Sequence, residues 1–181
     1  MGKTRVAING FGRIGRMVFR QAILDESLDV VSINATYPAE TLAHLIKYDS
    51  IHGTFEGDIE VTEEGLRVNG QDILHCDSRE PEKLPWEAND IDVVIEATGV
   101  FNSKEGASRH LDAGAKKVVL TAPGKDVDNT IVLGVNDDTF NADEHTIISN
   151  ASCTTNCLAP VVKVLDDAFT IENGLMTTVH A

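Results

Sequence analysis

The sequence predicts an α/β protein with a doubly wound, mostly parallel sheet, and three observations lead to this prediction. Short β-branched runs alternate with segments of helical periodicity along the chain, a rhythm typical of βαβ units. A glycine-rich turn, Gly10–Gly15, joins the first apolar run directly to the first helical segment. The chain has 181 residues, of which 42% are hydrophobic, so it can bury a full core of its own.

The first half of the chain alternates two strands with two helices and then turns into a small antiparallel region. Ile14, Val18 and Ala22 recur on one face of the first helical segment. Further on, the turn signal Asn69-Gly70 predicts an antiparallel excursion inserted in the parallel pattern. In chain order the predicted elements are a strand over Thr4–Asn9, a helix over Ile14–Leu24, a strand over Val30–Asn34, a helix over Ala39–Ile46 and the antiparallel excursion over Thr54–Cys76.

The second half continues the same rhythm. Gly114 stops the helix that follows the next strand. The last apolar strand pattern runs to the final residue without a terminating signal, so we expect a truncated chain. In chain order the predicted elements are a strand over Asp92–Ala97, a helix over Lys104–Ala113, strands over Lys117–Thr121, Thr130–Leu133 and Thr146–Ser149, a helix over Cys153–Phe169 and a strand over Leu175–Ala181.

Charge and composition exclude several classes of partner. The formal net charge is -14, and the resulting repulsion opposes nucleic acid and anionic membranes, but not a small anionic ligand held by local N–H groups. No run of about 18 apolar residues and no secretory leader are visible, so we expect a soluble, cytoplasmic protein. The three cysteines are an odd number without an export signal, which predicts reduced thiols. The histidines show no metal-ligand spacing, and we assign no metal.

Residues Gly10–Gly15 read G-F-G-R-I-G, a G-x-G-x-x-G sequence between an apolar strand and a helix. In such a turn one glycine permits the tight bend, one lets the backbone approach a pyrophosphate, and one lets the helix pack closely on the strand. The helix N-terminus adds free N–H donors and a positive potential. A glycine-rich turn can be purely structural, but the strand before it and the helix after it favour dinucleotide binding in a Rossmann-type fold.

Position 34 bears on the choice between NAD and NADP. In NAD-binding folds an acidic residue about 20 residues after the glycines bonds the adenosine ribose hydroxyls. This sequence has Asn34 at the end of the second strand, where no negative charge repels a 2′-phosphate, and Thr36 can donate a hydroxyl to one. The alternative is that Asn34 is only a turn residue. No arginine directly follows this strand, which weakens the case for NADP.

A second polar loop, Ser149–Cys157, runs straight into a helical segment. Cys153 stands in the first turn, where the helix dipole and unpaired N–H groups favour a nucleophilic thiolate. Cys157 lies one turn further in on the same face, and we expect it to be a small buried hydrophobic residue. A core position is also the alternative interpretation of Cys153, because free cysteines are among the most buried residues.

His180 lies in the last strand pattern, where alternation places it on the same face as Thr178. One interpretation is a structural, hydrogen-bonded histidine. The other is a partner for Cys153, since a thiol beside an imidazole is a recurring arrangement for attack on a carbonyl carbon. The spacing alone does not decide between the two.

Taken together, these residues resemble the glyceraldehyde-3-phosphate dehydrogenase family. The shared segments are spread over the whole chain: Val6–Arg16, Lys47–Gly53, Glu96–Gly99, Gly114–Val118, Thr121–Lys125 and Ser149–Cys157. The resemblance implies a Rossmann-type dinucleotide-binding domain over residues 1–150. It implies that residues 151–181 are the truncated start of an α+β catalytic domain, since family chains continue well beyond this point.

The resemblance also implies an oxidoreductase chemistry. Cys153 forms a thiohemiacetal with an aldehyde, a hydride passes to the nicotinamide, and inorganic phosphate releases the thioester. His180 matches the residue that acts as acid and base, while Ser152 and Thr154 flank the nucleophile and help to hold a phosphate. The residues implied to contact the cofactor, NAD or NADP, are Gly10, Gly12, Arg13, Ile14, Gly15, Asn34, Arg79, Thr98, Gly99 and Thr121.

The segment Asn34–Glu40 resembles the gluconeogenic bacterial branch that favours NADP, so the expected cofactor is NADP or NAD, with NADP preferred. The implied reaction is the phosphorylating oxidation of glyceraldehyde 3-phosphate to 1,3-bisphosphoglycerate, or its reverse. Two alternatives stay open, an erythrose-4-phosphate dehydrogenase and a catalytically incomplete NAD(P)-binding fragment. We expect the whole protein to be a homotetramer and this fragment alone to be inactive.

Overall fold

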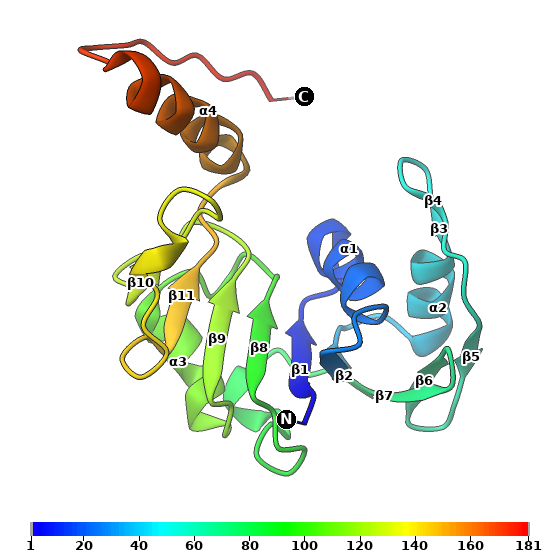
Figure 1. Ribbon diagram of the computed structural model, residues 1–181. Helices are drawn as coiled ribbons and strands as arrows, with labels where there is room; N and C mark the ends of the chain where they lie inside the picture. Colours follow the sequence, from blue (N-terminus) through cyan, green and yellow to red (C-terminus); the bar gives the residue numbers. More distant parts are fainter. Residues whose placement is uncertain (1, 181) are drawn as a thin grey trace.

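The structure, a computed structural model, describes residues 2–180 and is built around one nine-stranded sheet (Figure 1). Its strands are β1 (Thr4–Asn9), β2 (Leu28–Asn34), β5 (Ile59–Val61), β6 (Gly65–Val68), β7 (Gln71–Cys76), β8 (Val93–Glu96), β9 (Lys117–Leu120), β10 (Asn129–Thr130) and β11 (Ile147–Ser149). They lie in the order β10-β11-β9-β8-β1-β2-β7-β6-β5. All neighbours from β10 to β7 are parallel, and β6 and β5 add antiparallel strands at one edge.

Helices cover both faces of the sheet (Figure 1). Because side chains alternate along a strand, Val6 and Ile8 of β1 join the core that also contains Phe19, whereas Ala7 packs with Trp86 on the opposite face. The first face carries α1 (Arg13–Ala22) and α2 (Ala39–Lys47), and the second carries α3 (Lys104–Asp112). The smaller elements are the hairpin strands β3 (Tyr48–Asp49) and β4 (Gly53–Thr54) and the 3-10 turns η1 (Pro81–Lys83) and η2 (Asp137–Thr139).

The last helix, α4 (Cys153–Phe169), stands away from the sheet, and the chain after it turns back beside the helix (Figure 1). None of its residues is buried. The rest of the chain buries its apolar side chains between the sheet and the other three helices. The sheet therefore positions the candidate residues before position 150, and α4 positions those after it.

The predicted α/β fold with a mostly parallel sheet is confirmed, including the antiparallel excursion, which forms β5 and β6. The last strand of that segment, β7, joins the parallel part of the sheet beside β2. The predicted strand over Thr130–Leu133 ends at Thr130. Val132 donates its N–H to the side chain of Asn136 at 2.8 Å and Gly134 takes φ +76°, so the chain turns away from the sheet here.

The predicted strand over Leu175–Ala181 is wrong for residues 175–180, which form neither strand nor helix, and Ala181 lies outside the described residues. A strand is stable only when a neighbour satisfies its backbone N–H and C=O groups. No strand of the described chain pairs with this segment. The alternating pattern of the sequence is present, but the pairing partner is not.

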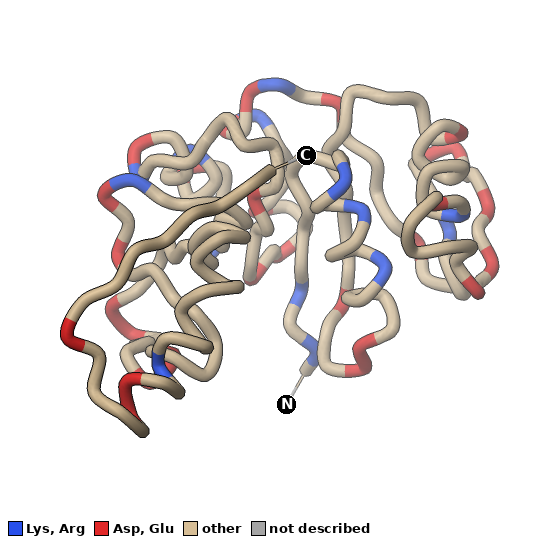
Figure 2. Tube along the Cα trace, turned by 90° about the horizontal axis from the view of Figure 1, so that it is seen from above, with Lys and Arg blue, Asp and Glu red and all other residues tan. Residues whose placement is uncertain are grey.

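The acidic residues are distributed along the whole trace rather than gathered on one element (Figure 2). Within residues 2–180, no helix combines the length and apolar character that crossing a membrane requires. The same part of the chain brings together no group of three or more His, Cys, Asp or Glu side chains that could hold a metal ion.

Candidate functional site

A cleft of about 470 Å³ opens at the carboxyl ends of β1, β2 and β8. β1 pairs with β2 on one side and with β8 on the other, so the strand order reverses here, and ligands of doubly wound sheets bind at this point. The cleft is lined by Gly10, Phe11, Gly12, Asn34, Ala35, Thr36, Tyr37, Ser78, Arg79, Pro81, Ala97, Thr98, Val100 and Phe101. A hollow of about 500 Å³ on the bare face of β8, β9 and β11 is mainly apolar and lacks such a turn.

Each glycine of the turn has its own geometric reason. Gly10 has φ +93°, and a Cβ there would lie 2.7 Å from the backbone nitrogen of Thr98. A Cβ on Gly15 would clash with the carbonyl oxygen of Gly10, so Gly15 lets α1 pack against β1. A Cβ on Gly12 would meet no atom within 4 Å. The missing side chain of Gly12 leaves room for an anion at the N-terminus of α1, which suits a pyrophosphate.

The residues predicted to contact a dinucleotide fall into three groups. Those that line the cleft are Gly10, Gly12, Asn34, Arg79 and Thr98. Those beside it are Gly99, which follows Thr98 with φ +76°, and Arg13, Ile14 and Gly15 in the first turn of α1. Thr121 stands apart: it donates its hydroxyl to the carbonyl oxygen of Glu96 at 3.1 Å and lines the apolar hollow instead.

The side chain of Asn34 is buried at the edge of the cleft and is already bonded within the protein. Its Nδ2 donates to Asn9 Oδ1 at 2.6 Å and to the carbonyl oxygen of Ser78 at 2.8 Å, and its Oδ1 accepts the N–H of Ser78 at 2.9 Å. These bonds hold the loop of Ser78 and Arg79 against the end of β2. Such bonds agree with the interpretation of Asn34 as a residue that fixes a turn. A contact between Asn34 and the adenosine ribose stays a prediction.

Sequence reasoning missed two polar residues beneath the cleft, Asn9 and Glu96. Each is the last residue of its strand, and both are about 1% exposed. In the register of the sheet Asn9 stands between Asn34 and Glu96. Part of the signal was available, because the first two predicted strands end on the polar residues Asn9 and Asn34, and the predicted strand over Asp92–Ala97 contains Glu96 one residue before its end.

Cys153 is the first residue of α4 and its side chain is exposed. The helix is capped by Ser152, whose hydroxyl oxygen accepts the N–H of Thr155 at 2.9 Å. The preceding loop is fixed by Ser149, whose Oγ accepts the N–H of Ala151 at 3.0 Å. The predicted position of Cys153 in the first turn of a helix is confirmed, and this turn presents the sulfur to solvent.

His180 reaches the same helix end from the far end of the described chain. Its Nε2 lies 3.4 Å from Thr154 Oγ1 and 2.9 Å from Thr178 Oγ1. The predicted neighbours of the nucleophile, Ser152 and Thr154, are thus a helix cap and a contact of His180. Within residues 2–180 no hydrogen bond joins the Cys153 sulfur to the imidazole, so the structure brings His180 beside the nucleophile without pairing the two.

The expectation that Cys157 is buried is wrong. Cys157 is exposed, because no residue of α4, the helix that carries it, is buried. Cys76, at the end of β7, is the cysteine that is partly buried. Burial raises the pKa of the Cys76 thiol, although a contact with the Ser32 hydroxyl at 3.7 Å acts in the opposite direction.

A doubly wound parallel sheet with a glycine turn at its switch point defines a dinucleotide-binding protein of the Rossmann type. Comparison with protein families specifies it further. Residues 4–104 match the family described as "Glyceraldehyde 3-phosphate dehydrogenase, NAD binding domain", and residues 152–181 match the corresponding C-terminal domain. The chain belongs to the glyceraldehyde-3-phosphate dehydrogenase family.

Curated relatives are similar along almost the whole chain. Glyceraldehyde-3-phosphate dehydrogenase 2 of Bacillus subtilis is 66% identical over 179 residues, which are 99% of this chain and 53% of the relative. Glyceraldehyde-3-phosphate dehydrogenase of Geobacillus stearothermophilus is 52% identical over 177 residues, or 98% of this chain and 53% of the relative. The chain spans about half the length of the curated relatives it matches.

Proposed function

We propose that this chain binds NAD(P) and supplies the catalytic cysteine of a phosphorylating glyceraldehyde-3-phosphate dehydrogenase. The observation that carries the proposal is Cys153 as the first residue of a capped helix, in a segment that matches the family's C-terminal domain. A thiol at a helix N-terminus is stabilised as a thiolate by the dipole and the free N–H groups. The cleft beside the glycine turn supplies the second requirement, a place for a dinucleotide.

In the proposed reaction the thiolate of Cys153 adds to the aldehyde carbon while the protonated imidazole of His180 gives a proton to the aldehyde oxygen. The hydroxyl of the resulting thiohemiacetal then returns this proton to His180 as the hydride leaves. The nicotinamide, when bound, supplies the acceptor for the hydride that leaves this carbon. Inorganic phosphate then attacks the Cys153 thioester, and the thiolate departs as the acyl phosphate forms. Ser152 and Thr154 flank the sulfur and would hold the phosphate oxygens.

Within the cleft we assign the pyrophosphate to the glycine turn and the first turn of α1, with Arg13 and Ile14, and the adenosine ribose to the neighbourhood of Asn34. Among the described residues 2–180, the lining of the cleft contains one cationic side chain, Arg79, and no carboxylate. Such a lining suits the extra dianionic phosphate of NADP, so we propose NADP as the preferred cofactor. Arg79 also follows Ser78, which Asn34 holds in place.

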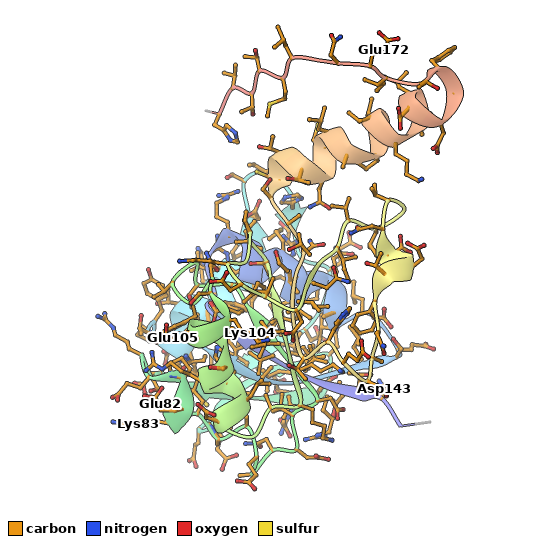
Figure 3. The ribbon with its side chains drawn as sticks, turned by 90° about the vertical axis from the view of Figure 1, so that its left-hand side faces the viewer. Glu82, Lys83, Lys104, Glu105, Asp143 and Glu172 are labelled. Carbon is orange, nitrogen blue, oxygen red and sulfur yellow. The ribbon has the colours of Figure 1, made fainter. Side chains whose placement is uncertain are left out.

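The cofactor proposal is tested by calorimetric titration of the chain with NADP and NAD. Replacement of Arg79 by Ala removes a charge-assisted bond worth roughly 1.5 to 3 kcal/mol. We therefore expect the Kd for NADP to rise at least about tenfold and the Kd for NAD to change much less. Lys83→Ala is the matched control, because Lys83 is a nearby exposed cation that pairs with Glu80 outside the cleft (Figure 3). An equal loss for both cofactors would contradict a 2′-phosphate contact.

The catalytic proposal is tested in the whole protein that contains this chain, with glyceraldehyde 3-phosphate, phosphate and either cofactor. Cys153→Ser should abolish turnover while leaving dinucleotide affinity unchanged. Preference for erythrose 4-phosphate would identify the sibling activity instead. The chain of 181 residues should bind the cofactor without turnover, because it spans only about half the length of its relatives. We also propose that the whole protein is cytoplasmic and that it forms a homotetramer. Sedimentation velocity would test the tetramer.

A further inference from the structure

A row of buried polar side chains crosses the floor of the cleft from one rim to the other. It runs from Asn34 through Asn9 to Glu96, and on to His110 and Trp86 on the α3 side of the sheet. All five are at most 5% exposed. A buried polar group without a partner costs about 1 to 3 kcal/mol, so each of these side chains depends on the orientation of its neighbour.

The direction of the bonds at the inner end is fixed by Trp86. An indole N–H can only donate, so the 3.0 Å bond from Trp86 makes Nδ1 of His110 the acceptor. The proton of the neutral imidazole is then on Nε2, which donates to Glu96 Oε2 at 2.9 Å. Burial by itself raises the pKa of Glu96, but the bonds from His110, Thr98 and Asn9 outweigh burial and lower it, so Glu96 is a carboxylate.

The direction of the bonds at the outer end is fixed by the same carboxylate. Asn9 Nδ2 donates to Glu96 Oε2 at 2.5 Å, which leaves Asn9 Oδ1 to accept from Asn34 at 2.6 Å. The amide of Asn34 is thereby oriented to exchange two bonds with the backbone of Ser78. The other four side chains in the row all donate toward Glu96, which accepts, so one orientation of the whole row gives each member a partner.

The other oxygen of Glu96 controls the opposite rim. Oε1 accepts the backbone N–H of Thr98 at 2.7 Å and also the Thr98 hydroxyl. Thr98 Oγ1 in turn accepts the N–H of Val100 at 3.0 Å. Thr98 packs against the glycine turn, where a Cβ on Gly10 would lie 2.7 Å from it. One buried carboxylate thus connects the loop after β8 with the loop after β7.

We propose that Glu96 is a positioning residue of the dinucleotide cleft. It sets the Thr98–Val100 rim directly and the Ser78–Arg79 rim through Asn9 and Asn34. This inference rests on the proposed function, because the ligand whose binding it affects is the dinucleotide. The proposal also assigns Asn34 a positioning role. The amide of Asn34 is then required because its N–H groups bond Asn9 and the Ser78 carbonyl, and not because it lacks a negative charge.

The test replaces Glu96 by Gln in the chain of 181 residues. Glutamine keeps the shape, but its amide nitrogen would face the donors of Asn9 and His110 in one orientation and the N–H of Thr98 in the other. His110 cannot relieve the conflict by moving its proton, because Trp86 donates to Nδ1. We expect the Kd values for NADP and NAD to rise together by roughly tenfold to a hundredfold. Glu105→Gln, an exposed change on α3 (Figure 3), is the control.

A second variant, Asn34→Asp, tests the Asn34 end of the row of buried side chains. It also keeps the proposal testable if Glu96→Gln does not fold. Its carboxylate would face Asn9 Oδ1 and the Ser78 carbonyl, so both cofactors should bind more weakly. A direct ribose contact would instead strengthen NAD, and that result would overturn the positioning role of Asn34. In the double variant the loss should be smaller than the product of the two single losses, because both changes act through one row of bonds.

Thermal unfolding is recorded for every variant, so that affinities are compared only between folded chains. If wild type binds neither dinucleotide, the proposed function itself fails. If wild type binds and the folded Glu96→Gln chain binds equally well, only the positioning role is overturned. If the loss of affinity in the double variant equals the product of the two single losses, the connection between Glu96 and Asn34 is likewise overturned.

Discussion

Two glycines of the turn, Gly12 and Gly15, should affect different properties of the protein when each is replaced by alanine. Gly12 has φ -73°, and a methyl group there meets nothing within 4 Å, so Gly12→Ala should lower the free energy of unfolding by less than about 1 kcal/mol, the usual cost of alanine at a helix N-cap. Gly15 packs against the backbone of Gly10, so Gly15→Ala should cost about 1 to 3 kcal/mol of stability, as overpacked substitutions do. The two substitutions add the same atoms to one turn and should act on different properties.

The corresponding binding prediction is that Gly12→Ala raises the Kd for NADP about tenfold or more, because the methyl group occupies the approach to the free N–H groups of α1. Urea unfolding and calorimetric titration measure the two properties. Gly2→Ala serves as control, since a Cβ at Gly2 also meets nothing within 4 Å and Gly2 lies outside the cleft. Wild-type affinity in Gly12→Ala would exclude the glycine turn as the pyrophosphate site.

What the sequence predicts at this scale depends on how local the cause is. The glycine turn and the position of Cys153 at a helix start follow from neighbouring residues, and both were predicted. The bond from Asn9 to Glu96 joins residues 87 positions apart, and strand order had to be known before these residues could be paired. Cys157 was placed wrongly because its burial depends on what covers α4, which periodicity does not specify.

Among the elements, the edge of the sheet at β10 and β11 depends on one carboxylate. Asp128 accepts the N–H of Thr146 at 2.9 Å and of Ile147 at 2.8 Å, and it also binds Lys104, the first residue of α3, at 2.5 Å (Figure 3). Burial alone would raise its pKa, but Lys104 and the backbone N–H groups hold the pKa of Asp128 well below its ordinary value. Three elements are therefore joined by the ionised form of this side chain.

The pH dependence follows from the sign of this shift. Because the pKa is lower in the folded than in the unfolded state, Asp128 contributes stability above pH of about 4, and the contribution is lost as the pH falls toward the folded pKa. Asp128→Asn should cost roughly 1.5 to 3 kcal/mol at pH 7, and the difference from wild type should shrink below pH of about 4. Urea unfolding across this range measures it, with the exposed Asp143→Asn as control (Figure 3). A difference that is constant with pH would exclude the ionised carboxylate as the cause.

At the scale of elements, the parallel sheet and its helices were predictable because β-branched runs and helical periodicity alternate regularly. The outcome for residues 175–181 was not predictable in this way. Their alternating pattern is typical of a strand, but the described chain provides no strand that pairs with residues 175–180. The short strand β10 shows the same limit: a side-chain bond from Asn136 to Val132 ends it sooner than its apolar pattern suggests. Where a strand forms and where it ends thus depends on pairing with other strands and on side-chain bonds that the local pattern does not specify.

Across the whole molecule, the core stops where the predicted dinucleotide-binding domain stops. Among residues 2–180, every buried apolar side chain lies at or before Ala151, and the last apolar strand residue among them is Ile147. By contrast, α4 exposes Val161, Val164 and Phe169. The stability of the described chain therefore resides in residues before α4, although the candidate nucleophile lies within that helix.

This distribution predicts that a chain ending at Ala151, one residue beyond the expected boundary at 150, folds as well as the chain of 181 residues. Since about 1 kcal/mol corresponds to roughly 2 to 4 °C in a domain of this size, the two midpoints of thermal unfolding should agree within about 2 °C. The affinity for NADP should also agree, because the lining of the cleft ends at Phe101. A shorter chain ending at His145 is the control: it lacks β11 and the buried Ile147, so it should unfold at a clearly lower temperature. If the chain ending at Ala151 is destabilised as much as this control, α4 belongs to the same folding unit as the sheet, and the division at residue 150 is wrong.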